Sequence, residues 1–372
     1  MKKSSKALSL MLAGVMALSL TACAGQTETA PSAESAPQTE GSSAEAAEGA
    51  SYRIGICQLV QHEALDAATQ GFQDAVKEEL GDAVTFDLQN AQGDSNTCST
   101  IINSFVSSDV DLIMANATAA LQAAQAGTNE IPILGTSVTE YGVALGIDDF
   151  NGTVGGNISG TADLAPLDEQ AAMLHELFPD AKNVGLLYCS AEANSQYQVD
   201  TVKAALEELG YTCEYYAFSD SNDLATIVTN AAGASDVIYI PTDNTAAANT
   251  EIINNICQPA GVPVIAGEEG ICRGCGVAAL TISYYDLGVA TGKMAVKILT
   301  GESDISQMPV EYAPQFTKKY NPAICEALGV EIPEVMRLLP NKSRKNGIKA
   351  PKAGRQGSSG TRHFAVSLSF CG

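Results

Sequence analysis

The chain contains no tryptophan and only three histidines among its 372 residues. The missing tryptophan excludes a sugar platform built by stacking on indole rings, although tyrosine and phenylalanine could still stack against a sugar. His62, His175 and His363 are scattered, and no close second pair of cysteines or histidines completes a four-ligand zinc site. We therefore predict no metal and no cofactor.

Positive charge is scarce. The chain has 20 Lys and Arg against 43 Asp and Glu, a net charge of −23. Because phosphate binding requires a basic face, we predict no nucleic-acid partner. Residues 51–333 alone hold 9 basic and 37 acidic residues, a net charge of −28, which also argues against docking on anionic lipid headgroups.

Catalytic motifs are also absent from the sequence. Neither a G-x-S-x-G elbow nor an H-E-x-x-H pair occurs. The glycine-rich stretch 152–160 fits neither the P-loop nor the dinucleotide-binding pattern, and we predict a loop there. Without a nucleophile, a base and an orienting group, we predict that the protein is not an enzyme.

The ten cysteines do not form a recognisable disulfide framework. Several lie inside apolar runs, as Cys57 and Cys189 do, where a free thiol behaves as a small hydrophobic side chain. Cys272 and Cys275 form a C-x-x-C between glycines, for which we predict a turn. A local disulfide and two free thiols both remain open for this pair.

Both ends of the chain differ from the middle. Lys2, Lys3 and Lys6 precede a short apolar run that ends at Leu-Thr-Ala-Cys, so residues 1–22 are predicted to be an export signal. The pattern resembles the bacterial lipoprotein signal, in which Cys23 would carry the lipid; a plain secretory signal is the alternative. Residues 23–51 are predicted to be a disordered tether. Residues 334–372 are basic, and we interpret them as a disordered extension rather than a tail for an anionic partner.

Between these ends, apolar strand patterns alternate with amphipathic helix patterns. This alternation predicts an α/β fold with two doubly wound parallel-sheet lobes. The predicted strands are 52–60, 84–88, 110–115, 131–135, 184–189, 211–217, 237–240, 262–266 and 277–282, with an extended segment at 310–316. The predicted helices begin with 63–81 and continue with 95–107, 119–126, 167–177, 196–209, 224–231, 246–257, 285–299 and 323–328.

Polar residues follow the predicted strands at their carboxyl ends, which is where open parallel sheets bind ligands. Asp243 follows a predicted buried strand. Burying its carboxylate charge there without a hydrogen-bond partner would cost free energy. Asp243 could cap the next helix, or it could face a cleft and accept a hydrogen bond from a ligand ammonium group. The other candidates that follow strands are Gln58, His62, Thr118, Ser137, Thr139, Glu192, Asn194, Ser195, Thr242, Asn244 and Glu268.

Four stretches carry a family resemblance: IGICQLVQHEALDAATQGF, SAEANS, IYIPTDNT and SYYDLGVATGKMAVKILTGE. They resemble the substrate-binding lipoproteins of ABC importers with a type I periplasmic-binding-protein fold, in particular the tryptophan-binding-like subgroup. The resemblance implies two lobes that close on a small ligand in an interlobe cleft. It places one lobe at 52–161 plus 284–307 and the other at 162–283 plus 308–333.

The resemblance further implies an extracytoplasmic protein, lipid-anchored through Cys23, that delivers its ligand to a membrane permease with an ATPase. For an aromatic amino acid, we expect Asp243 to bind the ammonium group, with Glu192 or Glu268 as second choices. Ser137, Thr139, Asn194 and Ser195 are the candidates for the carboxylate. Leu65, Val138 and Tyr284 are the candidates for an apolar wall, although each is an ordinary core residue as well.

Other functions stay open on the sequence alone. The same importer role could serve a sugar or a nucleoside. A ligand-sensing receptor domain would need a transmembrane helix and a cytoplasmic output region, and neither pattern follows residue 51. An exported enzyme on the same scaffold would need catalytic residues that we do not find.

Overall fold

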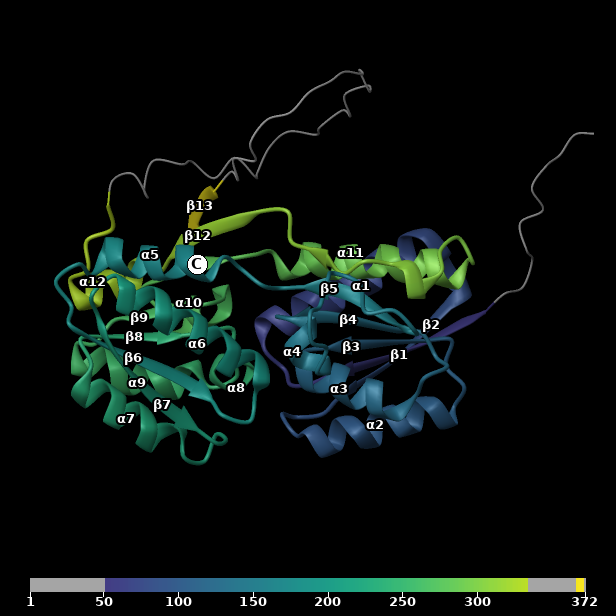
Figure 1. The fold of residues 1–372 in the computed structure, drawn as a ribbon, viewed down its shortest axis with the longest axis horizontal. Coiled ribbons are helices and arrows are strands. Elements are labelled where there is room, and N and C mark those ends of the chain that lie inside the picture. Colours follow the sequence, from purple (N-terminus) through teal and green to yellow (C-terminus); the bar gives the residue numbers. More distant parts are fainter. Residues whose placement is uncertain (1–50, 334–365, 371–372) are drawn as a thin grey trace, which may run out of the picture. The chain divides into compact units, whose positions relative to one another are not determined.

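The computed structural model of the chain describes residues 51–333 and the backbone of the strand at 366–370 (Figure 1). All of these residues belong to one compact unit. The expected export signal at 1–22, the lipidated Cys23, the tether up to residue 50 and nearly all of the basic tail lie outside the described residues.

The first sheet, called sheet A, is parallel throughout, with the strand order β11-β5-β4-β3-β1-β2. Its central strands are almost completely buried apolar runs, as expected for a sheet covered by helices on both faces. The strands are β1 (Tyr52–Gln58), β2 (Val84–Asn90), β3 (Leu112–Asn116), β4 (Ile133–Val138), β5 (Ile158–Ala162) and β11 (Glu311–Tyr312).

The second sheet, sheet B, has the strand order β13-β12-β10-β9-β8-β6-β7. It is parallel except where β12 runs antiparallel to β10. Its strands are β6 (Asn183–Cys189), β7 (Thr212–Phe218), β8 (Val237–Ile240), β9 (Val264–Ala266), β10 (Ala278–Thr281), β12 (Phe316–Tyr320) and β13 (Val366–Phe370). The prediction of two α/β lobes built on parallel sheets is therefore confirmed.

Helices connect the strands (Figure 1). Between the helices and each sheet lie separate apolar cores, on both faces of the sheet. In the order of the chain they are α1 (Glu63–Leu80), α2 (Ser95–Ser107), α3 (Thr118–Gly127), α4 (Tyr141–Leu145), α5 (Leu167–Leu177), α6 (Ala193–Glu208), α7 (Leu224–Ala234), α8 (Asn244–Ala247), α9 (Thr250–Ala260), α10 (Glu269–Cys275), α11 (Tyr284–Leu299) and α12 (Pro322–Leu328). Short 3₁₀ turns occupy Gly81–Ala83 and Ile305–Gln307.

Helix α11 follows β10 of sheet B but packs along α1 (Figure 1). Glycines make this close packing possible. A Cβ atom added at Gly288 would collide with the Ala68 carbonyl oxygen, and one at Gly71 would collide with the Tyr285 carbonyl oxygen. Close backbone contact of this kind fixes the start of α11, and therefore Tyr284, relative to the start of α1.

Four local predictions were wrong. Residues 152–160 are not loop throughout, because β5 begins at Ile158. The C-x-x-C segment is not a turn but the end of helix α10, which Glu268 caps. The predicted helix 246–257 is two helices, α8 and α9, that meet at Asn249. The predicted extended segment 310–316 forms the short β11 and only the first residue of β12.

The lobe boundaries expected from the sequence stay predictions. The strands of sheet A come from residues 52–162 and from β11, whereas those of sheet B come from 183–281, β12 and β13. The predicted boundary at residue 308 lies just before β11, which pairs with β5 in sheet A. Within the described residues, no helix combines the length and the hydropathy needed to cross a membrane.

Candidate functional site

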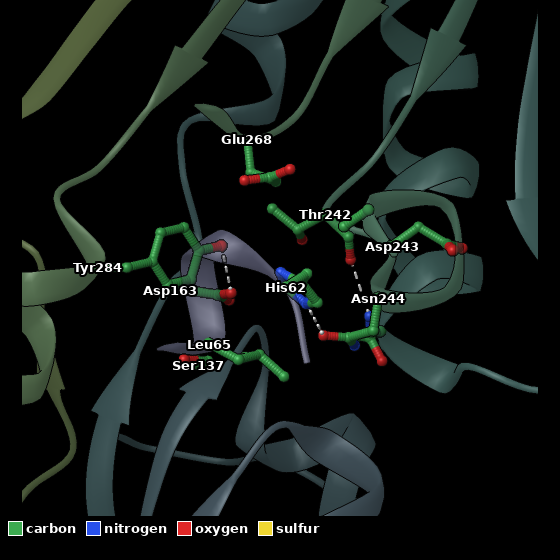
Figure 2. A pocket seen from close by; sticks show the side chains of 11 residues that line it. His62, Leu65, Ser137, Asp163, Thr242, Asp243, Asn244, Glu268 and Tyr284 are labelled. Atoms are coloured by element: carbon green, nitrogen blue, oxygen red, sulfur yellow. Dashed lines mark hydrogen bonds between the residues drawn. The ribbon is translucent and has the colours of Figure 1, made fainter. Parts of the chain in front are cut away.

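A small pocket lies where elements of the two sheets meet (Figure 2). We call its two sides the A wall and the B wall. The A wall comes from sheet A and the helices packed on it, and consists of His62, Leu65, Ser137, Asp163 and Tyr284. The B wall comes from sheet B and its helices, and consists of Asn194, Thr242, Asp243, Asn244, Ala247 and Glu268. The pocket has about 10 Å³ of water-accessible volume, roughly the space of one water molecule.

Direct contacts between the walls hold the pocket at this size. His62 Nε2 lies 3.1 Å from Asn244 Oδ1, and Thr139 Oγ1 lies 3.5 Å from Thr242 Oγ1. Arg273 on α10 also forms an ion pair with Glu63, the first residue of α1. A ligand larger than a few atoms could therefore enter only if these contacts separate.

Asp163 supplies the carboxylate of the A wall. It directly follows β5 and is almost fully buried. Its Oδ2 accepts a hydrogen bond of 2.8 Å from the Tyr284 hydroxyl, while its Oδ1 has no partner. Burial raises the pKa of this carboxyl, although the hydrogen bond from Tyr284 and the nearby Thr139 hydroxyl oppose the shift. A buried carboxylate oxygen without a donor is a ready partner for a ligand cation.

Two further polar atoms of the A wall are buried without a partner, Ser137 Oγ and His62 Nδ1. Ser137 lies in β4 with φ at 54°, a left-handed conformation that is rare for residues other than glycine. Backbone strain together with an unsatisfied hydroxyl is typical of a functional site. His62 precedes α1, and burial lowers its pKa even though its contact with Asn244 and the Glu192 and Asp66 charges act to raise it.

On the B wall, Asp243 does cap a helix. Its Oδ1 accepts from the Ala246 N–H at 2.8 Å at the start of α8, and its Oδ2 accepts from the Cys189 N–H at 2.6 Å. Figure 2 shows its carboxylate pointing away from Asp163 and Tyr284. Burial and the neighbouring Glu192 charge raise the pKa of Asp243. The capping role that the sequence left open for Asp243 is therefore confirmed.

Glu268, Asn194 and Thr242 also form hydrogen bonds within sheet B and its helices, whereas the Asn244 side-chain oxygen has His62 of the A wall as its partner. Glu268 accepts from the Gly270 and Ile271 N–H groups, and burial raises its pKa to about 7. Asn194 Nδ2 donates to the Thr242 carbonyl oxygen at 2.9 Å. Thr242 Oγ1 donates to Gln198 Oε1 at 2.7 Å. Glu192 does not line the pocket but accepts from Asn244 and Thr245, and so supports this wall from behind.

Eight of the thirteen predicted ligand-binding residues line the pocket: His62, Ser137, Asn194, Thr242, Asp243, Asn244, Glu268 and Tyr284. The other five are buried and do not line it: Gln58, Thr118, Thr139, Glu192 and Ser195. Gln58 instead holds α1 in place, because it donates to Asp66 and accepts from Thr69. Of the apolar candidates, Leu65 and Tyr284 line the pocket, whereas Val138 lies in the core.

Asp163 is the polar pocket residue that was not predicted from the sequence; Ala247 is the apolar one. The rule that found the others, a polar residue directly after a strand, applies to Asp163 too. Its strand went unrecognised because Ile158–Ala162 reads ISGTA, which lacks the continuous apolar run of a buried strand.

The other sequence candidates form no second site in the described residues. Cys272 and Cys275 are buried in the core on one face of sheet B. Within residues 51–333, no group of three or more His, Cys, Asp or Glu side chains is placed to hold a metal ion.

Comparison with known proteins identifies the scaffold. The model of the family "ABC transporter substrate binding protein" matches residues 53–343. A tyrosine-binding protein of Clostridioides difficile (strain R20291) is 34% identical over 313 residues, which cover 83% of this chain and 88% of that protein.

Two solved structures are similar as well. The structure of an ABC domain from Streptococcus pneumonia in complex with L-Trp has a TM-score of 0.73 and 33% identity, and the match covers 77% of this chain and 97% of that one. A substrate-binding protein with adhesive properties from Clostridium difficile, solved in a ligand-free, open form, has a TM-score of 0.59 and 37% identity, with 78% and 97% covered.

Proposed function

The chain belongs to the family of ABC transporter substrate-binding proteins, and on that basis we propose that it captures an aromatic amino acid between its two lobes. The family is a transporter component rather than an enzyme family, in line with the lack of a catalytic motif in the sequence. The ligand assignment is supported by two relatives, one named as a tyrosine-binding protein and one solved with L-Trp.

The observation that carries this proposal is the set of three unpartnered polar atoms in one pocket. Asp163 Oδ1, Ser137 Oγ and His62 Nδ1 are all buried, all lack a hydrogen-bond partner, and all belong to the A wall. Leaving such atoms unsatisfied costs about 1–3 kcal/mol each, so a ligand that satisfies them gains that energy. An acceptor beside a hydroxyl matches the ammonium and carboxylate groups of an α-amino acid.

In the proposed complex, Asp163 takes the place that the sequence assigned to Asp243. The ammonium group donates to Asp163 Oδ1, and the Tyr284 hydroxyl holds the other oxygen in position. Asp243 instead keeps α8 in place through its two backbone contacts. Leu65 and the ring of Tyr284 offer apolar surface to the aromatic side chain.

Binding requires that the walls separate first, because the pocket has room for about one water molecule. The described arrangement is more similar to the L-Trp complex than to the ligand-free, open relative, although the two are comparable in sequence identity. We propose that the lobes open at the contacts between the walls and close again around the ligand, with lobes at 52–161 plus 284–307 and 162–283 plus 308–333.

The proposed setting is the extracytoplasmic face of a bacterial membrane. The export signal at 1–22 and Cys23 would attach the protein by lipid, and residues 23–51 would link the anchor to the binding lobes. The ligand would be delivered to a permease with its ATPase. Replacing Cys23 with serine and asking whether the protein is still retained in the membrane fraction tests the anchor.

A thermal-shift screen with the twenty amino acids, common sugars and nucleosides tests the ligand. A ligand at 100 times its dissociation constant should add about 2.7 kcal/mol of stability. We expect shifts with tyrosine, tryptophan or phenylalanine. Shifts with sugars or nucleosides alone would end the amino-acid proposal and favour the alternative importer role.

A further inference from the structure

His62 is the only residue lining the described pocket whose side chain can become a cation. The other ionisable groups of the lining are the carboxyls of Asp163, Asp243 and Glu268 and the phenol of Tyr284. An α-amino acid brings a carboxylate into this acidic surrounding. The pocket therefore needs a feature that tolerates, or selects, the ligand's negative charge.

The hydrogen-bond network determines which ring nitrogen of His62 carries the proton. Asn244 Nδ2 donates to Glu192 Oε2 at 2.7 Å, so the other side-chain atom of Asn244 is its carbonyl oxygen. That oxygen lies 3.1 Å from His62 Nε2 and can only accept. Nε2 must therefore be protonated, and Nδ1 of the neutral ring carries a lone pair.

In this tautomer, the protonation state of His62 Nδ1 decides how the ring would interact with a ligand carboxylate. Nδ1 is buried, has no partner, and belongs to a residue of the A wall. A lone pair at Nδ1 would repel a ligand carboxylate, whereas a proton at Nδ1 would donate a hydrogen bond to it. Ser137 Oγ is a second unpartnered atom of the A wall, and its hydroxyl can donate without any change of charge.

We propose that His62 receives the ligand carboxylate through Nδ1, and that it does so only as the doubly protonated imidazolium. An amino acid then binds together with one proton taken from solvent, whereas the corresponding amine, which lacks the carboxylate, binds without that proton. This inference rests on the proposed function and names the residue that distinguishes an amino acid from its amine.

The groups around His62 support a proton that is absent before binding and present afterwards. Burial lowers the pKa of the free imidazole, so the ring is neutral near pH 7.5. A carboxylate at hydrogen-bond distance would raise this pKa above that pH. The charged and titratable neighbours are Asp66 on α1, Glu192 before α6, the three lining carboxyls and Tyr284, with Glu63 and Arg273 in the adjoining cavity.

The first test compares an amino acid with its amine: L-tyrosine with tyramine, and L-tryptophan with tryptamine. Affinities are measured by calorimetry, with displacement for weak ligands, between pH 6 and pH 8. The contact with Asp163 is common to both ligands and cancels in the ratio of their affinities. The preference for the amino acid should fall by up to about tenfold per pH unit as pH rises between the free and bound pKa values of His62.

Two histidine variants provide the comparison. In His62→Gln the amide donates without a titrating proton, so the amino acid's advantage should be smaller and should change by less than about twofold over the same pH range. The control is His175→Gln. His175 lies on α5 and does not line the pocket, and its Nδ1 lies 2.8 Å from the Tyr211 hydroxyl. This variant should keep the pH dependence of the wild type.

A direct readout is available because the chain has only three histidines. Ring ¹⁵N spectra of the full chain, assigned with the two variants, should show His62 as the Nε2–H tautomer at pH 7.5. It should become doubly protonated with L-tyrosine or L-tryptophan, and stay neutral with the amine.

A neutral His62 in a complex with a bound amino acid would overturn this inference alone. Failure of L-tyrosine, L-tryptophan and L-phenylalanine to bind at any pH would overturn the proposed function along with it.

Discussion

The two walls of the pocket differ in how their buried polar atoms are hydrogen-bonded. The two carboxylates of the B wall, Asp243 and Glu268, accept hydrogen bonds from backbone N–H groups on their own side of the molecule. The A wall holds three buried polar atoms without a partner, on Asp163, Ser137 and His62. A carboxylate in a pocket therefore points to a ligand only where one of its oxygens lacks a donor, as in Asp163, and not where both oxygens accept from the backbone, as in Asp243.

Substitution of Asp163 is the strongest test of the proposed difference between the two walls. Asp163→Asn removes the negative charge that faces the ligand ammonium group, and the binding free energy should weaken by about 3 kcal/mol, roughly a hundredfold or more in affinity. Calorimetry with L-tyrosine or L-tryptophan measures it. The free protein should stay folded, because burial already disfavours the charged form of this carboxyl. An affinity within twofold of wild type would remove Asp163 from the binding site.

The pH dependence of stability tests the burial of Glu268 on the B wall. Its pKa is raised from 4.5 to about 7, so the folded protein holds a proton that the unfolded chain has already lost in this range. The free energy of unfolding should therefore fall as pH rises from about 4.5 to 7, and Glu268 should contribute about 3 kcal/mol of this fall. Urea unfolding of Glu268→Gln should show a shallower decline than wild type. Parallel curves for the two proteins would contradict the assignment.

Asp243→Asn provides the counterpart of the Asp163 variant on the B wall. Asparagine can still cap α8 with its carbonyl oxygen, but it leaves the Cys189 N–H without an acceptor. We expect a loss of about 1–2 kcal/mol in the free energy of unfolding. Affinity for the amino acid should change by less than about threefold. An unchanged stability with a large loss of affinity would return the ammonium site to Asp243.

Two substitutions of Ser137 on the A wall should have the smallest effects on binding and stability. Ser137→Ala removes the unpartnered hydroxyl and should cost about 0.5–1.5 kcal/mol of binding free energy. Ser137→Gly removes the same hydroxyl but also relieves the positive φ, so its fold should be more stable than that of the alanine variant by about 1 kcal/mol. Equal stabilities for the two variants would argue against backbone strain at this position.

Much of the site could be predicted from one rule applied to the sequence. The carboxyl ends of the strands led to His62, Ser137 and the run Thr242–Asn244, because parallel strands end at a common edge. The rule failed at Asp163, since β5 is built from small residues that do not resemble a buried strand. It also placed Thr118 and Gln58 at the pocket, whereas both are buried and do not line it.

The sequence by itself determined the alternation of strands and helices, and with it two parallel-sheet lobes whose polar strand ends could form a binding site. Apolar periodicity is a property of short segments, so it can be read directly from the sequence. Only the tertiary structure decided which carboxylate keeps a free oxygen and which nitrogen of His62 holds a proton. Those outcomes depend on partners such as Tyr284 for Asp163 and Asn244 for His62, which lie 121 and 182 residues away along the chain. Hydrogen bonds act over about 3 Å in space, and folding alone sets which side chains come within that distance.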